Sequence, residues 1–182
     1  SFHIFFQNQE DFSFFVDKFN LPKSKGGLLP GSGVDTDEYG FHPLPKVRNL
    51  TLGIFCRLIE PKGIRLIVEA VDYLRQNKGV IVDLILGGLP SSDPRIAIPL
   101  ADIDDWQTDG LLEYVGALSS EEVKLSMLRC HCVVLPSTYS EGTPRVLLEG
   151  ASLGRVIVTT DHPGCNRVVN GRNGFLIQPH DI

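Results

Sequence analysis

The sequence predicts an α/β fold, in which a Rossmann-like parallel sheet carries helices on both faces. Short apolar runs rich in β-branched residues alternate with amphipathic helical patterns along the whole chain. Several of these runs are apolar at every position, as expected of parallel strands that are covered on both faces. Polar and glycine-containing motifs follow the ends of the runs, where ligands bind in such sheets. We therefore expect about seven strands in one sheet, with one shared site at its edge.

Composition limits the classes of fold and function. A chain of 182 residues can bury a sizeable core, and we expect residues 1–182 to form a single domain. The hydrophobic share of 42% and the charged share of 21% are ordinary for a globular protein. The net charge of −5 argues against a nucleic-acid partner, and no apolar run reaches the length of a transmembrane segment. A start without a signal-peptide pattern and an end just after a strand suggest a cytoplasmic fragment of a longer protein.

The first third of the chain reads as strand, helix and strand. Residues 3–7 form the first expected strand. In residues 9–19, apolar side chains recur at i, i+3, i+4 and i+7, and acidic residues occupy the first turn, which predicts a helix. A short strand over 28–30 leads into the sequence Gly-Ser-Gly-Val-Asp at 31–35. A long polar loop that contains proline follows over 36–47.

The middle of the chain repeats the alternation. Residues 50–57 form an apolar strand, and the helix expected over 63–76 has one apolar face. A strand over 80–86 ends at two glycines. The next expected elements are a helix over 101–108, a strand over 111–115 and a helix from 119 to 129 that begins with a Ser-x-x-Glu capping box.

Residues 132–161 are the segment around which we expect the site to form. A strand over 132–135 is followed by turn residues and then by a helix, which Thr143 can cap and which Pro144 can begin. A helix that begins directly after a strand and a glycine-containing loop offers free N–H groups and a positive dipole end to a phosphate. The strand 156–160, a short helix over 166–169 and the strand 174–177 complete the pattern.

Two carboxylates frame the loop before this helix. Glu141 precedes the helix and Glu149 lies on its second turn, so eight residues and roughly 12 Å of helical rise separate them. That separation is too large for one acid/base pair, but it suits contacts with two parts of an extended ligand. On spacing alone, two solvated glutamates are an equally good interpretation.

The string S-x-x-S-E-G-T-P-R-x-L-L-E over residues 137–149 resembles the Glu-x7-Glu signature of the retaining GT-B glycosyltransferases. This large family contains bacterial capsule, O-antigen and lipooligosaccharide enzymes. Four further motifs fall in that family's order: P-G-S-G-V-D at 30–35, R-L with K-G at 57–63, E-Y-V-G at 113–116, and T-T-D-H-P-G-C at 159–165. The resemblance covers nearly the whole chain and implies the C-terminal, nucleotide-sugar-binding half of a two-domain enzyme.

The resemblance also implies roles for individual residues. Arg57 and Lys62 would stabilise the departing diphosphate of the donor, as two cations at a strand end can do. Glu149 would accept hydrogen bonds from the ribose hydroxyls, and Glu141 would contact the donor sugar. The remaining predicted contacts are made by backbone that approaches the donor closely: Gly31, Gly33, Tyr114, Val115, Gly116, Gly142, Thr143 and Pro144.

The implied function is transfer of a sugar from a nucleotide sugar, with a UDP-sugar favoured, to a glycan or lipid-linked acceptor. The resemblance implies a retaining mechanism without a metal or other cofactor. It places acceptor binding in an N-terminal domain outside this chain, so the chain alone is expected to be inactive. The whole enzyme would be cytoplasmic or peripheral at the inner membrane. Two alternatives stay open: an epimerase-like GT-B protein that acts on a nucleotide sugar, and a non-catalytic nucleotide-binding module.

Two pairs of aspartates have a spacing found at metal sites, but they are weaker evidence than the five motifs above. The pairs Asp35/Asp37 and Asp102/Asp104 have Asp-x-Asp spacing, yet one falls in a turn and the other at a helix start, so we expect no metal site. The chain also departs from the family's pattern at Ser140, Gly150 and Arg155, none of which is a proposed ligand group.

Overall fold

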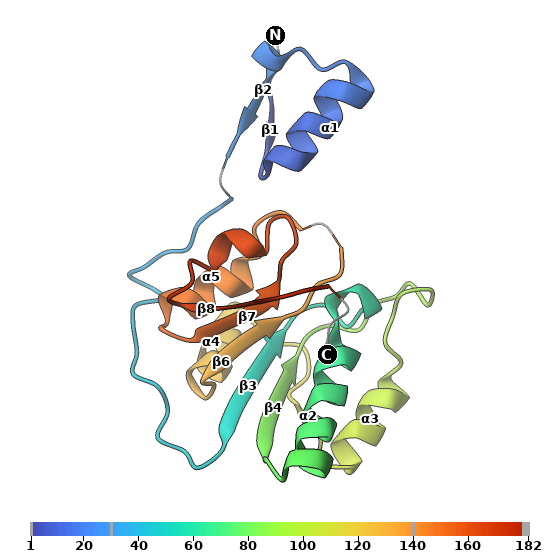
Figure 1. Cartoon of the computed structure of the whole chain (residues 1–182), viewed down its shortest axis with the longest axis vertical. Coiled ribbons are helices and arrows are strands. Elements are labelled where there is room, and N and C mark those ends of the chain that lie inside the picture. Colours follow the sequence, from blue (N-terminus) through green and yellow to red (C-terminus); the bar gives the residue numbers. More distant parts are fainter. Residues whose placement is uncertain (1, 30, 140, 180–182) are drawn as a thin grey trace.

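A computed structural model describes residues 2–29, 31–139 and 141–179, and a six-stranded parallel sheet forms its main body (Figure 1). Every neighbouring pair in this sheet is parallel. The strands in sheet order are β5 (Glu113–Tyr114), β4 (Val82–Gly87), β3 (Leu50–Phe55), β6 (Cys132–Leu135), β7 (Val156–Thr160) and β8 (Gly174–Ile177). The predicted Rossmann-like fold class is confirmed.

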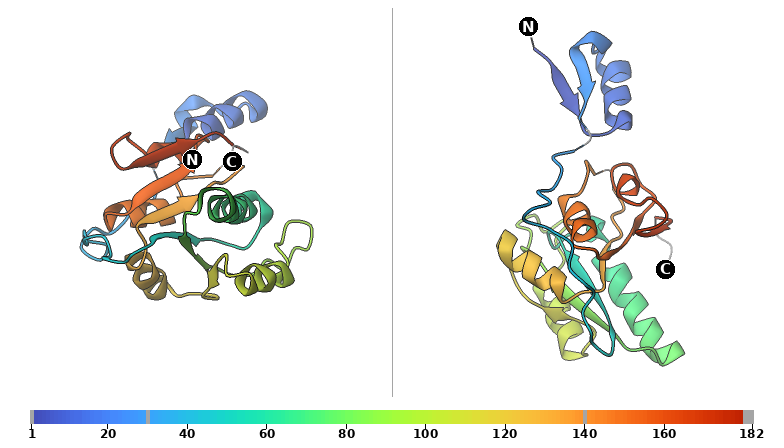
Figure 2. Two further views of the ribbon diagram at one scale, coloured as in Figure 1. Left: turned by 60° about the horizontal axis from the view of Figure 1, so that its bottom comes forward. Right: turned by 90° about the vertical axis from the view of Figure 1, so that its left-hand side faces the viewer.

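Helices cover both faces of this sheet (Figure 2). The helices α2 (Ile64–Lys78) and α3 (Leu100–Thr108) pack into one core cluster, and α4 (Ser120–Leu128) and α5 (Arg145–Ser152) pack into the other. The predicted capping box is present at α4, where Ser119 and Glu122 each accept the other's backbone N–H. No helix in the described ranges is long and apolar enough to cross a membrane.

The first strands of the chain do not join this sheet, contrary to the expectation of one sheet. β1 (Ile4–Phe6) pairs in parallel with β2 (Gly26–Leu28), and α1 (Gln9–Phe19) and the 3₁₀ turn η1 (Lys23–Lys25) lie between them in sequence. Figures 1 and 2 show this N-terminal unit beyond one end of the main body. A strand–helix–strand pattern in the sequence predicts where the strands lie, but not which strands pair with one another. The sequence therefore could not show that these strands form two separate sheets.

The order of strands changes direction between β3 and β6. From β3 the chain adds β4 and β5 toward one edge, then crosses back and adds β6, β7 and β8 toward the other edge. Loops that leave the carboxyl ends of strands at such a switch point diverge and leave a crevice. The loop after β3 carries Arg57 and Lys62, and the loop after β6 carries Glu141.

Candidate functional site

An ion pair joins the two loops at the switch point. Lys62 and Glu141 form a salt bridge although they are 79 residues apart in sequence, and only 8% of Lys62 is exposed. The Ser137 hydroxyl donates a second hydrogen bond to the same carboxylate at 2.9 Å, and the Lys62 ammonium lies 5.2 Å from the Tyr139 ring centroid. Burial lowers the pKa of Lys62, but the hydrogen bond and the charge of Glu141 outweigh it and raise the pKa above its usual value. The ammonium therefore stays charged at neutral pH.

The backbone around Lys62 fits closely against the loop after β6. Lys62 ends the 3₁₀ turn η2 (Glu60–Lys62) and α2 begins at Ile64, so Lys62 lies just before the helix. Gly63 links the two with a φ of 72°, and a Cβ on it would lie 2.3 Å from the Pro136 carbonyl oxygen. The Pro61 carbonyl oxygen accepts the N–H of Thr138 at 2.9 Å. The two loops are thus fixed together, and Lys62 with them.

A cavity of about 260 Å³ lies beside this ion pair at the carboxyl ends of β3 and β4. Arg57 and Glu149, which were predicted to serve one ligand, both line it. Cys56 also lines it, and burial raises the pKa of this thiol to about 12, with smaller effects from the charges of Lys62, Glu141 and Arg57. Those charges are therefore grouped around one neutral thiol. Arg57 after β3 and Glu149 on α5 thus line one cavity, and Lys62 and Glu141 lie close enough to Cys56 to affect its pKa.

Glu149 is a buried carboxylate at the wall of this cavity. It is 8% exposed, and its partner one turn earlier in α5, Arg145, contacts it at 3.1 Å from a largely exposed position. Burial raises the pKa of Glu149 above its usual value, and the opposing effect of Arg145 is smaller. A buried acid with a raised pKa weakens folding when it ionises, so a structural role explains Glu149 poorly.

The raised pKa predicts how Glu149 affects stability. A raised folded-state pKa favours folding below the unfolded pKa of about 4.3, and that contribution is lost as the pH rises through the folded value. At pH 7 we expect Glu149→Gln to unfold at the same temperature as the wild type or at a higher one. The unfolding temperature of the variant should rise relative to that of the wild type from pH 4 to pH 7. Thermal unfolding across this range checks it, with the exposed Glu69→Gln as the charge control. A Glu149→Gln variant that is clearly less stable at pH 7 would assign the carboxylate to the Arg145 ion pair.

Residues 114–116, whose backbone was predicted to contact the donor, are hydrogen-bonded to a residue that lines the cavity. The Tyr114 hydroxyl donates to the Gly88 carbonyl oxygen at 3.0 Å, and the Gly88 N–H donates to the Gly116 carbonyl oxygen at 2.9 Å. Val115 donates its N–H to the Leu86 carbonyl oxygen at 2.9 Å. These contacts hold residues 114–116 along the end of β4, where Gly88 lines the cavity.

The loop before α5 is packed from several sides. A Cβ on Gly31 would lie 2.9 Å from the Thr143 Cβ, and one on Gly164 would lie 1.7 Å from the Gly142 carbonyl oxygen. Gly31 therefore reaches the site, whereas Gly33 has no heavy atom within 4 Å of its Cβ direction among the described residues. Thr143 does not cap the helix as predicted, because Pro144 occupies the N-cap position and no side chain caps α5.

Two residues of the N-terminal unit, which sequence reasoning did not single out, contact this loop. The Gln7 side-chain oxygen accepts the N–H of Thr143 at 3.1 Å, and the Asn8 side-chain nitrogen donates to the Glu141 carbonyl oxygen at 3.3 Å. The predicted departure at Ser140 lies outside the described residues. The hydroxyl of Thr143 is buried without a hydrogen-bond partner in the described part of the chain.

The Asp-x-Asp pairs have other uses. One Asp35 side-chain oxygen accepts the N–H of Asp37 at 2.9 Å within a turn, and Asp102 pairs with Arg65. Among residues 2–29, 31–139 and 141–179, no three histidine, cysteine, aspartate or glutamate side chains group as metal ligands would.

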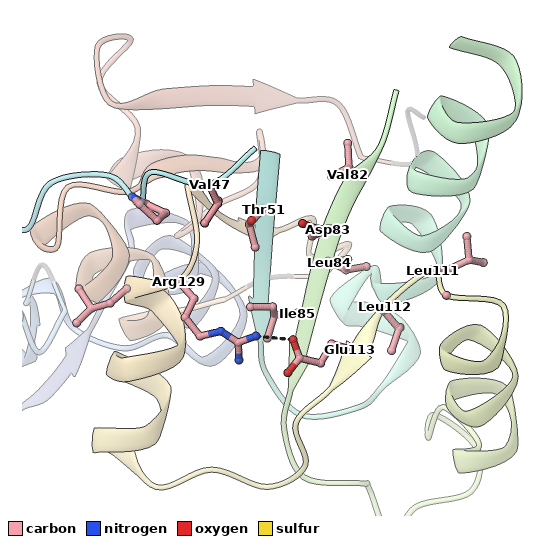
Figure 3. A pocket seen from close by; sticks show the side chains of 13 residues that line it. Val47, Thr51, Val82, Asp83, Leu84, Ile85, Leu111, Leu112, Glu113 and Arg129 are labelled. Carbon is pink, nitrogen blue, oxygen red and sulfur yellow. Dashed lines mark hydrogen bonds and ion pairs between the residues drawn. The ribbon is translucent and has the colours of Figure 1, made fainter. Parts of the chain in front are cut away.

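A larger cavity of about 570 Å³ lies at the opposite ends of the strands (Figure 3). Thr51, Val82 and Asp83 line it from the starts of β3 and β4, and an ion pair of 2.5 Å between Arg129 and Glu113 crosses it. None of the residues predicted for the site lines this cavity.

Comparison with known sequences identifies one family and partial relatives. A family model described as "Glycosyl transferases group 1" matches residues 49–182. AmsK of Erwinia amylovora, an amylovoran biosynthesis glycosyltransferase, is 29% identical over 132 residues, or 69% of this chain and 31% of AmsK. WcaL of Escherichia coli (strain K12) is 27% identical over 175 residues, or 91% of this chain and 41% of WcaL. The chain spans 31% to 41% of the length of the curated relatives it matches.

Comparison with solved structures shows the same fold. Anabaena HepE in complex with UDP-glucose matches with a TM-score of 0.76 and 22% identity, over 98% of this chain and 50% of that chain. The C-terminal domain of LpcC, a glycosyl transferase group 1 family protein of Francisella tularensis, matches with a TM-score of 0.60 and 22% identity, over 81% of each chain. The HepE match includes the N-terminal unit, whereas the family model begins at residue 49.

Proposed function

The chain belongs to the glycosyl transferases group 1 family, and we propose that it is the donor-binding half of a retaining glycosyltransferase that uses a nucleotide sugar. Among nucleotide sugars we propose a UDP-sugar. The observation that carries this proposal is the placement of Arg57 and Glu149 on one cavity, with the buried ammonium of Lys62 beside it. HepE, which shares the fold, was crystallised with UDP and with UDP-glucose, and this supports the choice of UDP.

The proposed donor occupies the crevice in four parts. The ribose lies at Glu149, whose carboxylate accepts hydrogen bonds from the hydroxyls. The diphosphate lies between Arg57, which is exposed at the cavity, and Lys62. The sugar lies at the loop of residues 141–143, which carries Glu141 and the Thr143 hydroxyl, for which the described residues provide no hydrogen-bond partner. The base lies along residues 114–116.

The chemistry that this arrangement supports is departure of a diphosphate. As the bond between the sugar C1 and the phosphate oxygen breaks, negative charge grows on the diphosphate. Arg57 and Lys62 stabilise that charge more in the transition state than in the ground state, and no bound metal is required for it. The acceptor hydroxyl attacks C1 from the face that the diphosphate leaves and gives its proton to the departing phosphate oxygen, so the products are the glycoside and the nucleoside diphosphate and the configuration at C1 is retained.

The acceptor belongs to the wider protein in this proposal. Because the chain spans only part of its relatives, we propose that residues outside it bind a glycan or lipid-linked acceptor and that the chain alone binds donor without transferring it. AmsK is named for amylovoran biosynthesis, which supports a role in polysaccharide assembly. We place the whole enzyme in the cytoplasm or at the inner face of the membrane.

Calorimetric titration with UDP, GDP and ADP tests the proposed donor. We expect UDP to bind at least about tenfold more tightly than the purine nucleotides, and Arg57→Ala to weaken UDP binding about tenfold or more, because a charge-assisted contact with phosphate is lost. The exposed Arg48→Ala, outside the crevice, is the matched control and should bind as the wild type does.

Glu149→Gln provides a second arm of the same titration. It should weaken UDP binding while unfolding no earlier than the wild type, so reduced binding could not be attributed to misfolding. Preference for a purine nucleotide would contradict the choice of UDP, and failure to bind any of the three would contradict a donor site in this chain.

A further inference from the structure

The turn between β1 and α1 reaches across to the loop before α5. Figure 1 shows the end of the N-terminal unit at which β1 passes into α1 facing the loops of the main body. Gln7 and Asn8 form this turn. Their contacts with residues 141–143 bridge 133 to 136 positions of sequence. The family model begins at residue 49, so it assigns nothing to them.

The contact of Gln7 is close and specific. Its side-chain oxygen accepts the N–H of Thr143 at 3.1 Å, and a Cβ on Gly142 would lie 1.9 Å from that oxygen. The Gln7 backbone carbonyl in turn accepts a hydrogen bond from Arg167 at 3.2 Å, and Arg167 also lies 3.6 Å from Glu10 of α1. The turn is thus fixed to the main body on two sides.

Asn8 serves two purposes with different atoms. It is fully buried, and its side-chain oxygen accepts the N–H of Asp11 at 2.6 Å and so caps α1. Its side-chain nitrogen donates to the Glu141 carbonyl oxygen at 3.3 Å and to Asp11 at 2.8 Å. Because cap and loop contact use separate atoms, a substitution can remove the second and keep the first.

Both the side chain and the backbone of Glu141 therefore hold the loop in place. Its carboxylate contacts Lys62 and Ser137, and its backbone carbonyl contacts Asn8. The next contact along the chain is that of Gln7 with Thr143. We propose that Gln7 and Asn8 are positioning residues of the donor site, which hold residues 141–143 in the place where they meet the sugar of the nucleotide sugar. This inference rests on the proposed function.

A comparison of UDP with UDP-sugars tests the inference. For each variant, calorimetry gives the dissociation constants of UDP, UDP-glucose, UDP-galactose and UDP-N-acetylglucosamine, and the ratio of UDP to the tightest UDP-sugar measures what the sugar contributes. We expect Gln7→Ala and Asn8→Ser to lower this ratio roughly fivefold or more, because each removes a hydrogen bond that holds the loop. The affinity for UDP itself should stay within about twofold of the wild type.

The controls separate positioning from general damage. Asn8→Ser keeps a side-chain oxygen that can cap α1. Gln9→Ala is the matched control, because Gln9 begins α1, is exposed, and its side chain forms a hydrogen bond with Ser13 of the same helix. It should leave the ratio unchanged. Thermal unfolding of each variant shows that it is folded.

The possible outcomes are distinct. An unchanged ratio in Gln7→Ala and Asn8→Ser, or a parallel loss of UDP and UDP-sugar affinity, would overturn the positioning role and leave the donor site standing. A wild type that binds UDP but gains nothing from any of the three sugars would also overturn it. A wild type that binds no UDP would contradict the proposed function itself.

Discussion

Lys62→Ala is expected to weaken UDP binding about a hundredfold, whereas Glu141→Gln, which changes the other member of the same ion pair, is expected to strengthen it several-fold. The first effect follows from the burial of Lys62, of which 8% is exposed. A buried, charge-assisted contact is worth up to about 3 kcal/mol, which corresponds to roughly two orders of magnitude in affinity.

The second effect follows from competition within the protein. In the structure, the Glu141 carboxylate forms an ion pair with the ammonium of Lys62. We expect a diphosphate to displace this carboxylate, so that only the fraction of molecules with a free ammonium binds and the apparent affinity is reduced by that fraction. Glutamine keeps the size of the side chain and can still accept the Ser137 hydrogen bond, but it carries no charge to compete.

Titration of both variants with UDP checks these effects. Lys78→Ala is the control for Lys62, because Lys78 is exposed at the far end of α2. If the ion pair only stabilised the two loops, both variants would bind UDP more weakly, and the interpretation of Lys62 as a diphosphate ligand would fail. Opposite effects from the two partners cannot arise from lost stability.

Sequence reasoning predicted those parts of the fold and the site that are each determined within a single short segment of the chain. The strands, the capping box at Ser119 and the place of Glu149 on α5 are local features, and periodicity or spacing determines them. The family resemblance added that Arg57 and Glu149 serve one ligand, and the structure places both on one cavity. Their roles toward a donor stay predictions.

The contacts that sequence reasoning missed join segments far apart in the chain. It assigned Lys62 to the diphosphate and Glu141 to the sugar, yet it did not predict that the two side chains pair. It assigned no role to Gln7 or Asn8, because polar residues between a strand and a helix are ordinary turn residues. The separation of β1 and β2 from the main sheet was missed for the same reason, since pairing depends on the tertiary fold.

Arg155 is a further case, and its replacement is expected to give the largest loss of stability. The sequence marked it only as a departure from the family pattern. In the structure it is 2% exposed, and its guanidinium donates to the carbonyl oxygens of Cys130 at 3.0 Å, Pro43 at 3.0 Å, Leu153 and His42. Burial lowers the pKa of Arg155 below its usual value, and no carboxylate of the described residues forms an ion pair with it.

Arg155→Leu should lower the free energy of unfolding by about 3 kcal/mol, because several buried or part-buried carbonyl groups lose a donor and each costs roughly 1 kcal/mol. For a chain of this size that is a fall of roughly 6–12 °C in the unfolding temperature. The stability of Arg155→Lys should lie between that of the wild type and that of Arg155→Leu. An ammonium keeps the charge, but it cannot donate to so many acceptors at once. Calorimetric unfolding measures all three, with the exposed Arg172→Leu expected within about 0.5 kcal/mol of the wild type.

The position of these acceptors predicts where Arg155→Leu first loosens. His42 and Pro43 belong to the segment that connects the N-terminal unit to β3, and Ser152 holds the same segment through the Tyr39 carbonyl oxygen at 2.6 Å. We expect limited proteolysis of Arg155→Leu to cut within residues 36–47 sooner than in the wild type. Because that segment carries the unit that contains Gln7, the variant should also lose affinity for a UDP-sugar relative to UDP. Unchanged proteolysis together with a fall in unfolding temperature would place the effect in the core around Cys130 instead.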